Sequence, residues 1–335
     1  MFVHVMARAN LPAKKYKKSN PTQIRLSFEG MGSITTYIDI ARALSAINRK
    51  FYRQGLYYYV NSVEIYNNEQ SVFDIMTLPD TWVTKNAWNR GFQLFQKMNS
   101  MVDDPITNMG RPKYHDFKVY MTNEHRAAAQ NGLTQHLNML PYTHYPGATN
   151  AMVHGSLGEW DYSQFVSADS DGDIDGETIG QQADNFYVHM VGTHSGSSDN
   201  WTSVGLIKSY AESRVTVTPA EPNDQQVDNT DPLINIFDFS SEEQMNDIID
   251  LLKTENDQPP YDLNSYVGED VSTGGGLTQV ARIGTEVGLG RVGKAAGFCA
   301  PMGLIAVDVS DADTAWRLVL NLAPGTYHGV YAERV

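Results

Sequence analysis

Residues 303–335 alternate between apolar and polar side chains in a way that limits how this chain can fold. Trp316, Leu318 and Leu320 recur at every second position, the spacing at which a β-strand turns side chains to one face. A short polar stretch at 310–313 supplies a turn. Because a lone hairpin is barely stable in water, this pattern predicts an antiparallel meander with one buried face and earlier strands to pair with it.

Similar β-rich stretches occur along most of the chain, whereas helical spacing of apolar residues is confined to a few segments. Strands are predicted at 55–66, 71–78, 116–122, 158–166, 185–191, 204–210, 214–218 and 277–285. One helix is predicted at 36–51 and another at 240–253, and a third is predicted to begin after Asp80 as its N-cap. Because the strands come in runs and do not alternate with helices, the fold class is predicted to be all-β, an antiparallel sandwich or barrel.

Composition fits a β-rich protein that is stabilised by packing and assembly. The 335 residues include 18 Tyr and 5 Trp, which favour sheets and wet contact surfaces. No apolar run approaches the roughly 18 residues of a membrane span, so no membrane insertion is expected, and the first residues are too interrupted for a signal peptide. A single cysteine, Cys299, forms no internal disulfide, so an intracellular origin is expected.

Charge is distributed unevenly along the chain. The formal net charge is −14, yet residues 1–53 hold ten Lys or Arg against two acids, Glu29 and Asp39. Residues 221–270 hold fourteen acids and one base, Lys253, which predicts a long acidic surface excursion. A basic end on an acidic body is typical of a polyanion-facing arm; the alternative is a solubilising tail.

The strongest nucleic-acid signal lies in this basic end. Residues 1–33 lack sustained periodicity and are predicted to form a flexible or extended arm. Its lysines can neutralise phosphates, and a tyrosine among them can stack on a base. The predicted nucleic-acid-binding residues are Arg8, Lys14, Lys15, Tyr16, Lys17, Lys18 and Arg25. Bases on the following helix are expected to extend this surface inward: Arg42, Arg49, Lys50 and Arg53.

One acidic stretch has the pattern of a calcium loop. Asp171, Asp173 and Asp175 fall at the first, third and fifth loop positions, with Gly176 at the sixth, where a hard cation needs oxygen ligands and a sharp turn. The twelfth position holds Gln182 in place of the bidentate Glu. The alternative is a solvated acidic turn between strands, and no other cofactor is indicated.

Other motifs do not support nucleotide binding or catalysis. The segment 288–294 has phosphate-loop spacing, but Ala295 stands where a magnesium-binding hydroxyl is required, so a mobile Gly-rich connector is predicted at 288–303. The segment 154–156 has His where a nucleophile elbow needs Gly. His189 is interpreted as a satisfied strand histidine, and no enzymatic activity is predicted.

Several segments, taken in their order along the chain, carry a family resemblance. They include Leu78-Pro79-Asp80-Thr81-Trp82 and lie at 37–40, 48–55, 78–84, 114–119, 158–164, 189–192, 210–214, 298–305 and 323–330. Together they resemble the capsid proteins of circular, Rep-encoding single-stranded DNA viruses, the circovirus-like group. The resemblance covers most of the chain from about residue 35 onward.

The resemblance implies a single antiparallel jelly-roll β-sandwich over 34–335, with a few helices in long inter-strand loops, behind the basic arm of 1–33. It implies self-assembly into an icosahedral shell around a small single-stranded DNA genome that the arm faces. The expected location is the virion after assembly in the host cell, with the nucleus as one candidate compartment. The acidic excursion at about 219–276 is expected on the outer surface or at a symmetry axis.

One departure and two rival functions stand beside this interpretation. Members of the group commonly carry a longer Arg/Lys-rich terminus than this chain does. A calcium-dependent glycan-binding jelly-roll module would instead use the loop of Asp171, Asp173 and Asp175 to hold calcium against a sugar. A hydrolase with a loop-built cleft is the third alternative, for which the sequence selects no residues.

Overall fold

The computed structural model describes residues 22–102, 116–130, 138–141, 160–168, 183–197, 200–214, 267–268, 276–285, 292–310 and 315–335. The first elements are β1 (Arg25–Met31), β2 (Thr36–Asp39), α1 (Ile40–Asn48), β3 (Leu56–Tyr66), β4 (Ser71–Thr77), α2 (Trp82–Val102), α3 (Asn123–Gln130), β5 (Asn138–Met139), β6 (Gln164–Ala168) and β7 (Ala183–His189). The others are β8 (Ser195–Ser197), β9 (Asn200–Gly205), α4 (Leu206–Arg214), β10 (Thr278–Thr285), β11 (Val292–Ala300), the 3₁₀ turn η2 (Pro301–Gly303), β12 (Leu304–Ser310), β13 (Ala315–Leu322), β14 (Pro324–Tyr327) and β15 (Ala332–Arg334).

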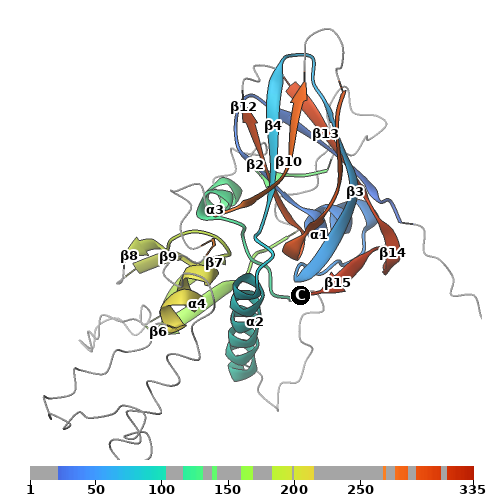
Figure 1. Ribbon diagram of the computed structural model, residues 1–335. Coiled ribbons are helices and arrows are strands. Elements are labelled where there is room, and N and C mark those ends of the chain that lie inside the picture. The colour runs from blue at the N-terminus through green and yellow to red at the C-terminus, as the bar shows by residue number, and fades with distance from the viewer. Residues whose placement is uncertain are drawn as a thin grey trace, which may run out of the picture.

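Eight strands form a two-sheet sandwich with the strand order of a jelly roll (Figure 1). The first sheet runs β1-β13-β3-β11, with β15 also on β3, and the second runs β10-β4-β12-β2-β5. The eight strands can be numbered in chain order from one (β1) to eight (β13), leaving out the strands of the insertion. The first sheet then has the order one, eight, three, six, and the second has the order five, four, seven, two. All pairs among these eight are antiparallel. This order is two Greek keys joined as a jelly roll, so the predicted fold class is confirmed.

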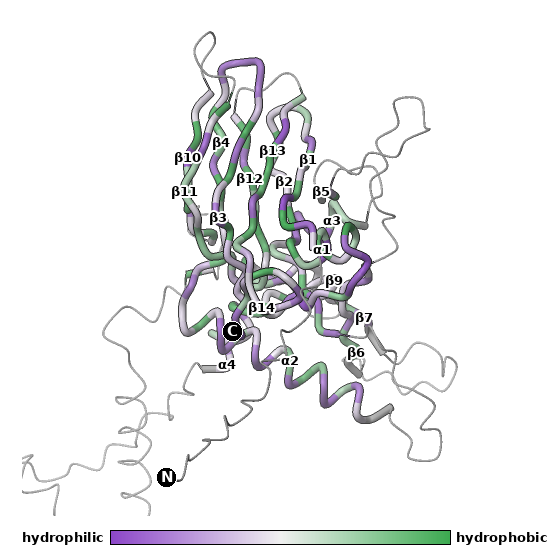
Figure 2. Tube along the Cα trace, turned by 90° about the vertical axis from the view of Figure 1, so that its right-hand side faces the viewer, coloured by the Kyte–Doolittle hydropathy of each residue, from purple (hydrophilic) through white to green (hydrophobic). Residues whose placement is uncertain are grey.

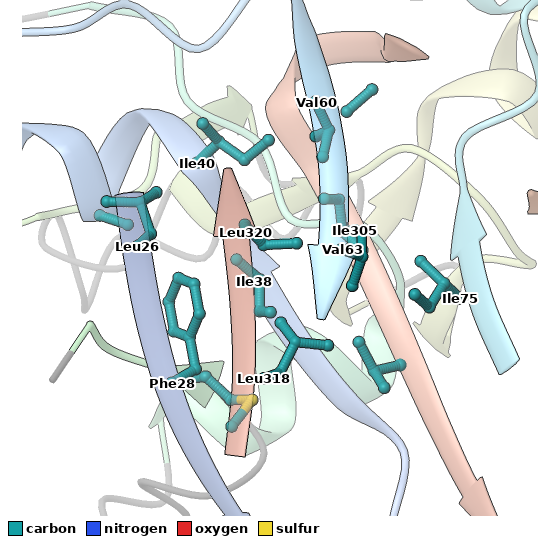
Figure 3. Packing of buried hydrophobic residues seen from close by; sticks show 14 of the residues in the cluster. Leu26, Phe28, Ile38, Ile40, Val60, Val63, Ile75, Ile305, Leu318 and Leu320 are labelled. Carbon is teal, nitrogen blue, oxygen red and sulfur yellow. The ribbon is translucent and has the colours of Figure 1, made fainter. Parts of the chain in front are cut away.

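The inner faces of the two sheets share one hydrophobic core. In β1, Leu26 and Phe28 are fully buried while their neighbours in the strand are partly or fully exposed, and Leu318 and Leu320 of β13 are likewise buried. Burying each such side chain contributes about 1.5–3 kcal/mol. Figure 3 shows the two sets of side chains meeting: Leu26, Phe28, Val60, Val63, Leu318 and Leu320 from the first sheet, and Ile38, Ile75 and Ile305 from the second.

The two strands predicted to form the C-terminal meander lie in different sheets. β12 pairs with β2 and β4, whereas β13 pairs with β1 and β3. The strands and the alternating burial of β13 are as predicted, but the meander is wrong. A jelly roll sends these successive strands to opposite sheets, and local alternation carries no information on which distant strand each will pair with.

Residues 78–277 form a long insertion between β4 and β10. Its described part holds α2, α3, β5, α4 and the small sheet β6-β7-β9-β8. α2, α4 and the small sheet lie below the sandwich in Figure 1 and Figure 2, whereas β5 pairs with β2 of the second sheet. Trp88 and Phe95 of α2, with Phe117, pack against Leu304 and Ala306 on the outer face of β12. The insertion therefore adds a second core, and β12 becomes buried on both faces.

Within the insertion, two predicted strands are wrong. The stretch 204–210 ends β9 and continues as α4, because Leu206 and Ile207 are buried in the second core from a helix. The stretch 116–122 forms only a single bridge at Tyr120. The strand predicted at 185–191 corresponds to β7, whereas the one predicted at 158–166 overlaps β6 only at 164–166. Of the strand predicted at 214–218, Arg214 ends α4 and the remainder lies outside the described residues, as do the helix predicted at 240–253 and most of the acidic excursion.

The start of α2 also differs by one residue from the prediction. Thr81 caps the helix, since its Oγ1 accepts a hydrogen bond from the backbone N–H of Thr84 at 3.2 Å. Asp80, predicted as the N-cap, instead accepts a hydrogen bond from the Tyr57 hydroxyl at 2.8 Å and lies 3.3 Å from Lys85 Nζ. Two adjacent residues with capping side chains are not distinguished by sequence alone.

The Gly-rich stretch at 288–303 is not the predicted connector, because most of it forms β11. β11 is antiparallel to β3, so the phosphate-loop pattern does not lead into a parallel nucleotide fold. A Cβ at Gly293 would lie 2.1 Å from the Ile283 side chain, and one at Gly297 would lie 2.5 Å from the Val60 carbonyl oxygen. These glycines permit close packing within the sandwich.

β1 lies within the 1–33 segment that the sequence assigned to the arm, so the sandwich takes in part of that segment. Its Gly30 lies under the ring of the buried Trp316, whose Nε1 donates to the Gly32 carbonyl oxygen at 3.3 Å. A Cβ at Gly30 would come within 2.1 Å of that ring. β1 is thus fixed to the sandwich by close packing as well as by its ladder.

We predict that Gly30→Ala lowers the free energy of unfolding by about 1–3 kcal/mol, because the new methyl group overpacks the site beneath Trp316. Gly284→Ala on β10 is the matched control, since nothing lies within 4 Å of its Cβ position, and it should change stability by less than about 0.5 kcal/mol. Urea unfolding followed by tryptophan fluorescence measures both. Equal stability of the two variants would mean that β1 does not pack against Trp316.

Candidate nucleic-acid interface

The chain joins the sandwich through a fixed contact that we call the arm root: Thr22, Gln23, Asn48, Arg49, Lys50, Arg53 and His328. The backbone N–H of Gln23 donates to Asn48 Oδ1 at 2.8 Å, and Asn48 Nδ2 donates back to the Gln23 carbonyl oxygen at 3.1 Å. Thr22 Oγ1 donates to the carbonyl oxygen of His328 at 2.7 Å. The residues that follow the basic cluster are therefore held between the end of α1 and the turn after β14.

α1 places one half of the arm root, and its sequence sets both of its ends. Asp39 is the N-cap, and its Oδ1 accepts a hydrogen bond from the backbone N–H of Arg42 at 3.1 Å. The helix ends at Asn48, and the C-cap Arg49 has left-handed backbone geometry with φ of 51°. The helix predicted at 36–51 is therefore too long, because residues 36–39 pair with β12 as β2.

A buried polar network anchors the N-terminal end of α1. Gln54 Nε2 donates to Asp39 Oδ2 at 3.0 Å and to the Val119 carbonyl oxygen at 2.8 Å, while Gln54 Oε1 accepts from the Val119 N–H at 2.6 Å. Burial raises the pKa of Asp39 to about 6, against the opposing effects of its hydrogen bond from the Arg42 backbone and of the Arg42 charge. The network thus ties the start of α1 to Gln54, just before β3, and to the insertion.

Arg42 does not belong to the basic surface, contrary to the prediction. Its side chain is only 4% exposed, and among the described residues its Nη1 has no hydrogen-bond partner. Helical spacing placed Arg42 on a flank of the helix, but that flank faces the insertion and not solvent. Its charge therefore acts inside the protein, on the carboxyl of Asp39.

The other three bases predicted to extend the arm do gather at the arm root. Arg49 and Arg53 are exposed and Lys50 is partly exposed. Lys50 Nζ lies 3.4 Å from Thr22 Oγ1, and Arg53 Nε lies 3.4 Å from a carboxylate oxygen of Asp116. Because their backbones are held by α1 and by its hydrogen-bonded neighbours, these cations are positioned beside the point where the chain enters the sandwich.

A tyrosine cluster supports the arm root from below. The Arg53 N–H donates to the Tyr327 hydroxyl at 2.9 Å, and the Tyr58 hydroxyl donates to the Arg53 carbonyl oxygen at 2.5 Å. The Tyr52 hydroxyl donates to the carbonyl oxygen of His328 at 3.0 Å, and the rings of Tyr52 and Tyr327 meet edge to face at 5.9 Å. This cluster gives the cationic surface a rigid base.

Of the predicted nucleic-acid-binding residues, the structure describes Arg25 alone. Arg25 is exposed at the start of β1, and its Nη2 lies 3.4 Å from Glu64 Oε2 on the outer face of the first sheet. The others lie outside the described residues: Arg8, Lys14, Lys15, Tyr16, Lys17 and Lys18. The predicted calcium ligands also lie outside them: Asp171, Asp173 and Asp175. Among the residues that are described, no group of three or more His, Cys, Asp or Glu could hold a metal.

His189 is a satisfied core histidine, as predicted. It is fully buried; its Nε2 lies 3.1 Å from the Thr193 carbonyl oxygen and its Nδ1 lies 2.7 Å from Ser203 Oγ. Because a carbonyl only accepts, Nε2 carries the hydrogen and Nδ1 accepts from the serine. Burial lowers the pKa of His189 to about 4. With Ser203 also fully buried, this pair is closed to substrates.

No family model, curated protein or solved structure matches the chain. Across the described part of the chain, none of the helices combines the length and apolar character that a membrane crossing requires.

We predict that Asp39 makes stability fall as pH rises from about 4 to above 6. Its folded pKa is raised above the usual 3.8 to about 6, so the folded state holds the proton more tightly. The stabilisation is complete below the unfolded pKa and is lost as pH rises through the folded one. Urea unfolding measures the free energy of unfolding of the unaltered chain and of Asp39→Asn, whose side chain does not titrate. As pH rises across this range, the free energy of unfolding of the unaltered chain should fall by roughly 3 kcal/mol relative to that of Asp39→Asn. A relative rise, or no change, would contradict the assignment.

Proposed function

We propose that this protein is a viral capsid subunit that self-assembles into an icosahedral shell around a small single-stranded DNA genome. The observation that carries the proposal is a jelly-roll sandwich whose first strand follows directly on a basic N-terminal segment. The order of the segments that resemble circovirus-like capsid proteins supports the same proposal. In this proposal the shell is built from copies of the sandwich, and the basic segment faces the packaged genome.

The charge distribution supports a division of labour between arm and body. A body rich in acids repels a polyanion, so contact with the genome requires a local excess of bases. The arm provides Lys14, Lys15, Lys17 and Lys18, and the arm root adds Arg49, Lys50 and Arg53 at its junction with the sandwich. The acidic residues of 221–270 would then face away from the genome, on the outside of the shell or at a symmetry axis.

Several large apolar side chains on the surface suit contacts between subunits. Met31, Leu94 and Val166 are each more than half exposed, at 53%, 54% and 53%, and they come from β1, α2 and β6. Closed symmetry repeats each contact many times, so interfaces of modest size can stabilise a whole shell. Contacts made by both the sandwich and the insertion would then join neighbouring copies.

Negative-stain microscopy of the purified full-length protein tests the proposal. We expect uniform closed particles that protect nucleic acid from nuclease. A well-folded 37.3 kDa species that never assembles over a range of salt and protein concentrations would contradict it. A stoichiometric calcium site together with sugar binding, and no particles, would instead support the glycan-binding module.

We predict that replacing Lys14, Lys15, Lys17 and Lys18 by Ala leaves folding and particle formation intact but lowers the encapsidated nucleic acid. The matched control replaces Lys85, Arg90, Lys97 and Arg282 by Ala, which changes the net charge by the same amount on α2 and β10. The ratio of absorbance at 260 and 280 nm of purified particles measures the content. Equal ratios for the arm variant and the unaltered chain would refute the role of the arm.

A further inference from the structure

A groove lies on the outer face of the first sheet, and none of its lining residues belongs to the arm root. Its volume is about 640 Å³, within the roughly 300–1,000 Å³ typical of ligand sites. The side chains that define it come from β1, β13, the end of β3 and the turn between β3 and β4: Arg25, Ser27, Glu29, Tyr66, Asn68 and Arg317. Cationic and aromatic groups therefore share one concave surface.

Glu64 holds two cations beside this groove: Arg25, which lines it, and Lys294, which lies outside its lining. Arg25 Nη2 and Lys294 Nζ lie 3.4 Å and 3.5 Å from its carboxylate oxygens, and the Tyr66 hydroxyl donates to it at 2.9 Å. The Tyr66 hydrogen bond is the largest cause of a lowered pKa at Glu64, with Lys294 and Arg25 adding to it. One carboxylate thus faces two cations, whose side chains are 61% and 67% exposed.

The rest of the groove is close to neutral and rigid. Arg317 donates from Nε and Nη2 to Glu29 Oε1, at 3.1 Å and 2.5 Å, which fixes this ion pair along β1 and β13. Val319 lines the groove and is 3% exposed, so it closes the groove from beneath. Tyr66 is 36% exposed, which leaves part of its ring open to a ligand.

We propose that this groove binds a segment of single-stranded nucleic acid, with a phosphate at Arg25 and Lys294 and a base stacked on Tyr66. The inference rests on the proposed function and adds to it a structured contact beside that of the arm. The chain itself connects the two, because Arg25 follows the arm root within a few residues at the start of β1. A strand neutralised by the lysines of the arm would meet this groove next.

The chemistry favours a nucleic acid over an uncharged sugar. The contacts of Arg25 and Lys294 with Glu64 are long. A phosphate oxygen can therefore replace the Glu64 carboxylate as the charge-assisted acceptor for these two cations. Stacking on an aromatic ring accepts any base and so suits a genome of mixed sequence. An uncharged sugar would leave the excess positive charge at Glu64 unused.

Fluorescence anisotropy of a labelled oligothymidylate with the full-length chain, over a series of salt concentrations, tests the groove. Tyr66→Ala should weaken binding about five-fold or more through loss of a stacked base, with the salt dependence unchanged. Tyr66→Phe should retain most of the affinity. Arg25→Gln should reduce the slope of log K against log salt by about 0.7, the value for one phosphate contact on a single strand.

Two control variants lie outside the groove and match the residue types. Tyr331→Ala changes a tyrosine that is 42% exposed, and Arg282→Gln changes an arginine whose side chain is 67% exposed; both should bind as the unaltered chain does. If Tyr66→Ala and Arg25→Gln behave like these controls while particles form and carry nucleic acid, the groove inference is wrong and the proposed function stands. The groove inference would also be wrong if the groove variants abolished binding of an oligosaccharide and left binding of oligothymidylate unchanged. An unaltered chain that forms no particles and binds no oligothymidylate would count against the proposed function itself.

Discussion

The shared core between two sheets is the constraint on which the rest of the structure depends. Every second side chain of the sandwich strands turns inward, and the resulting burial holds β1 and β13 against β2, β4 and β12. β12 is covered on both faces, because the insertion packs its aromatic residues against Leu304 and Ala306. The insertion is therefore part of the fold, and its second core fixes where α2 and α4 lie.

The same packing determines where the basic end of the chain emerges. α1 sits between β2 and β3, and the network of Asp39 and Gln54 joins it to both the sandwich and the insertion. Its last residue, Asn48, exchanges two hydrogen bonds with Gln23, so the chain is held in place before the ladder of β1 begins. A polyanion that contacts the arm would thus be guided along a fixed direction, past exposed cations and toward the outer face of the first sheet.

Alternation identified β3, β4, β10, β12 and β13 from sequence, because strand formation at a half-buried surface leaves a local pattern. Partnership between strands leaves none, so the sheet to which each C-terminal strand belongs could not be predicted. The arm root was missed for the same reason, since the contact of Thr22 with His328 joins residues 306 positions apart. Likewise, helical spacing set Arg42 on a flank but could not show that the insertion covers it.

In the proposed function, copies of this sandwich contact one another around nucleic acid. Sedimentation velocity of nuclease-treated, full-length protein, recorded at both 260 and 280 nm, tests it most directly. We predict one fast boundary that absorbs strongly at 260 nm, as expected of uniform shells with protected cargo. A single slow boundary of the 37.3 kDa chain, free of nucleic acid under every salt condition, would contradict it.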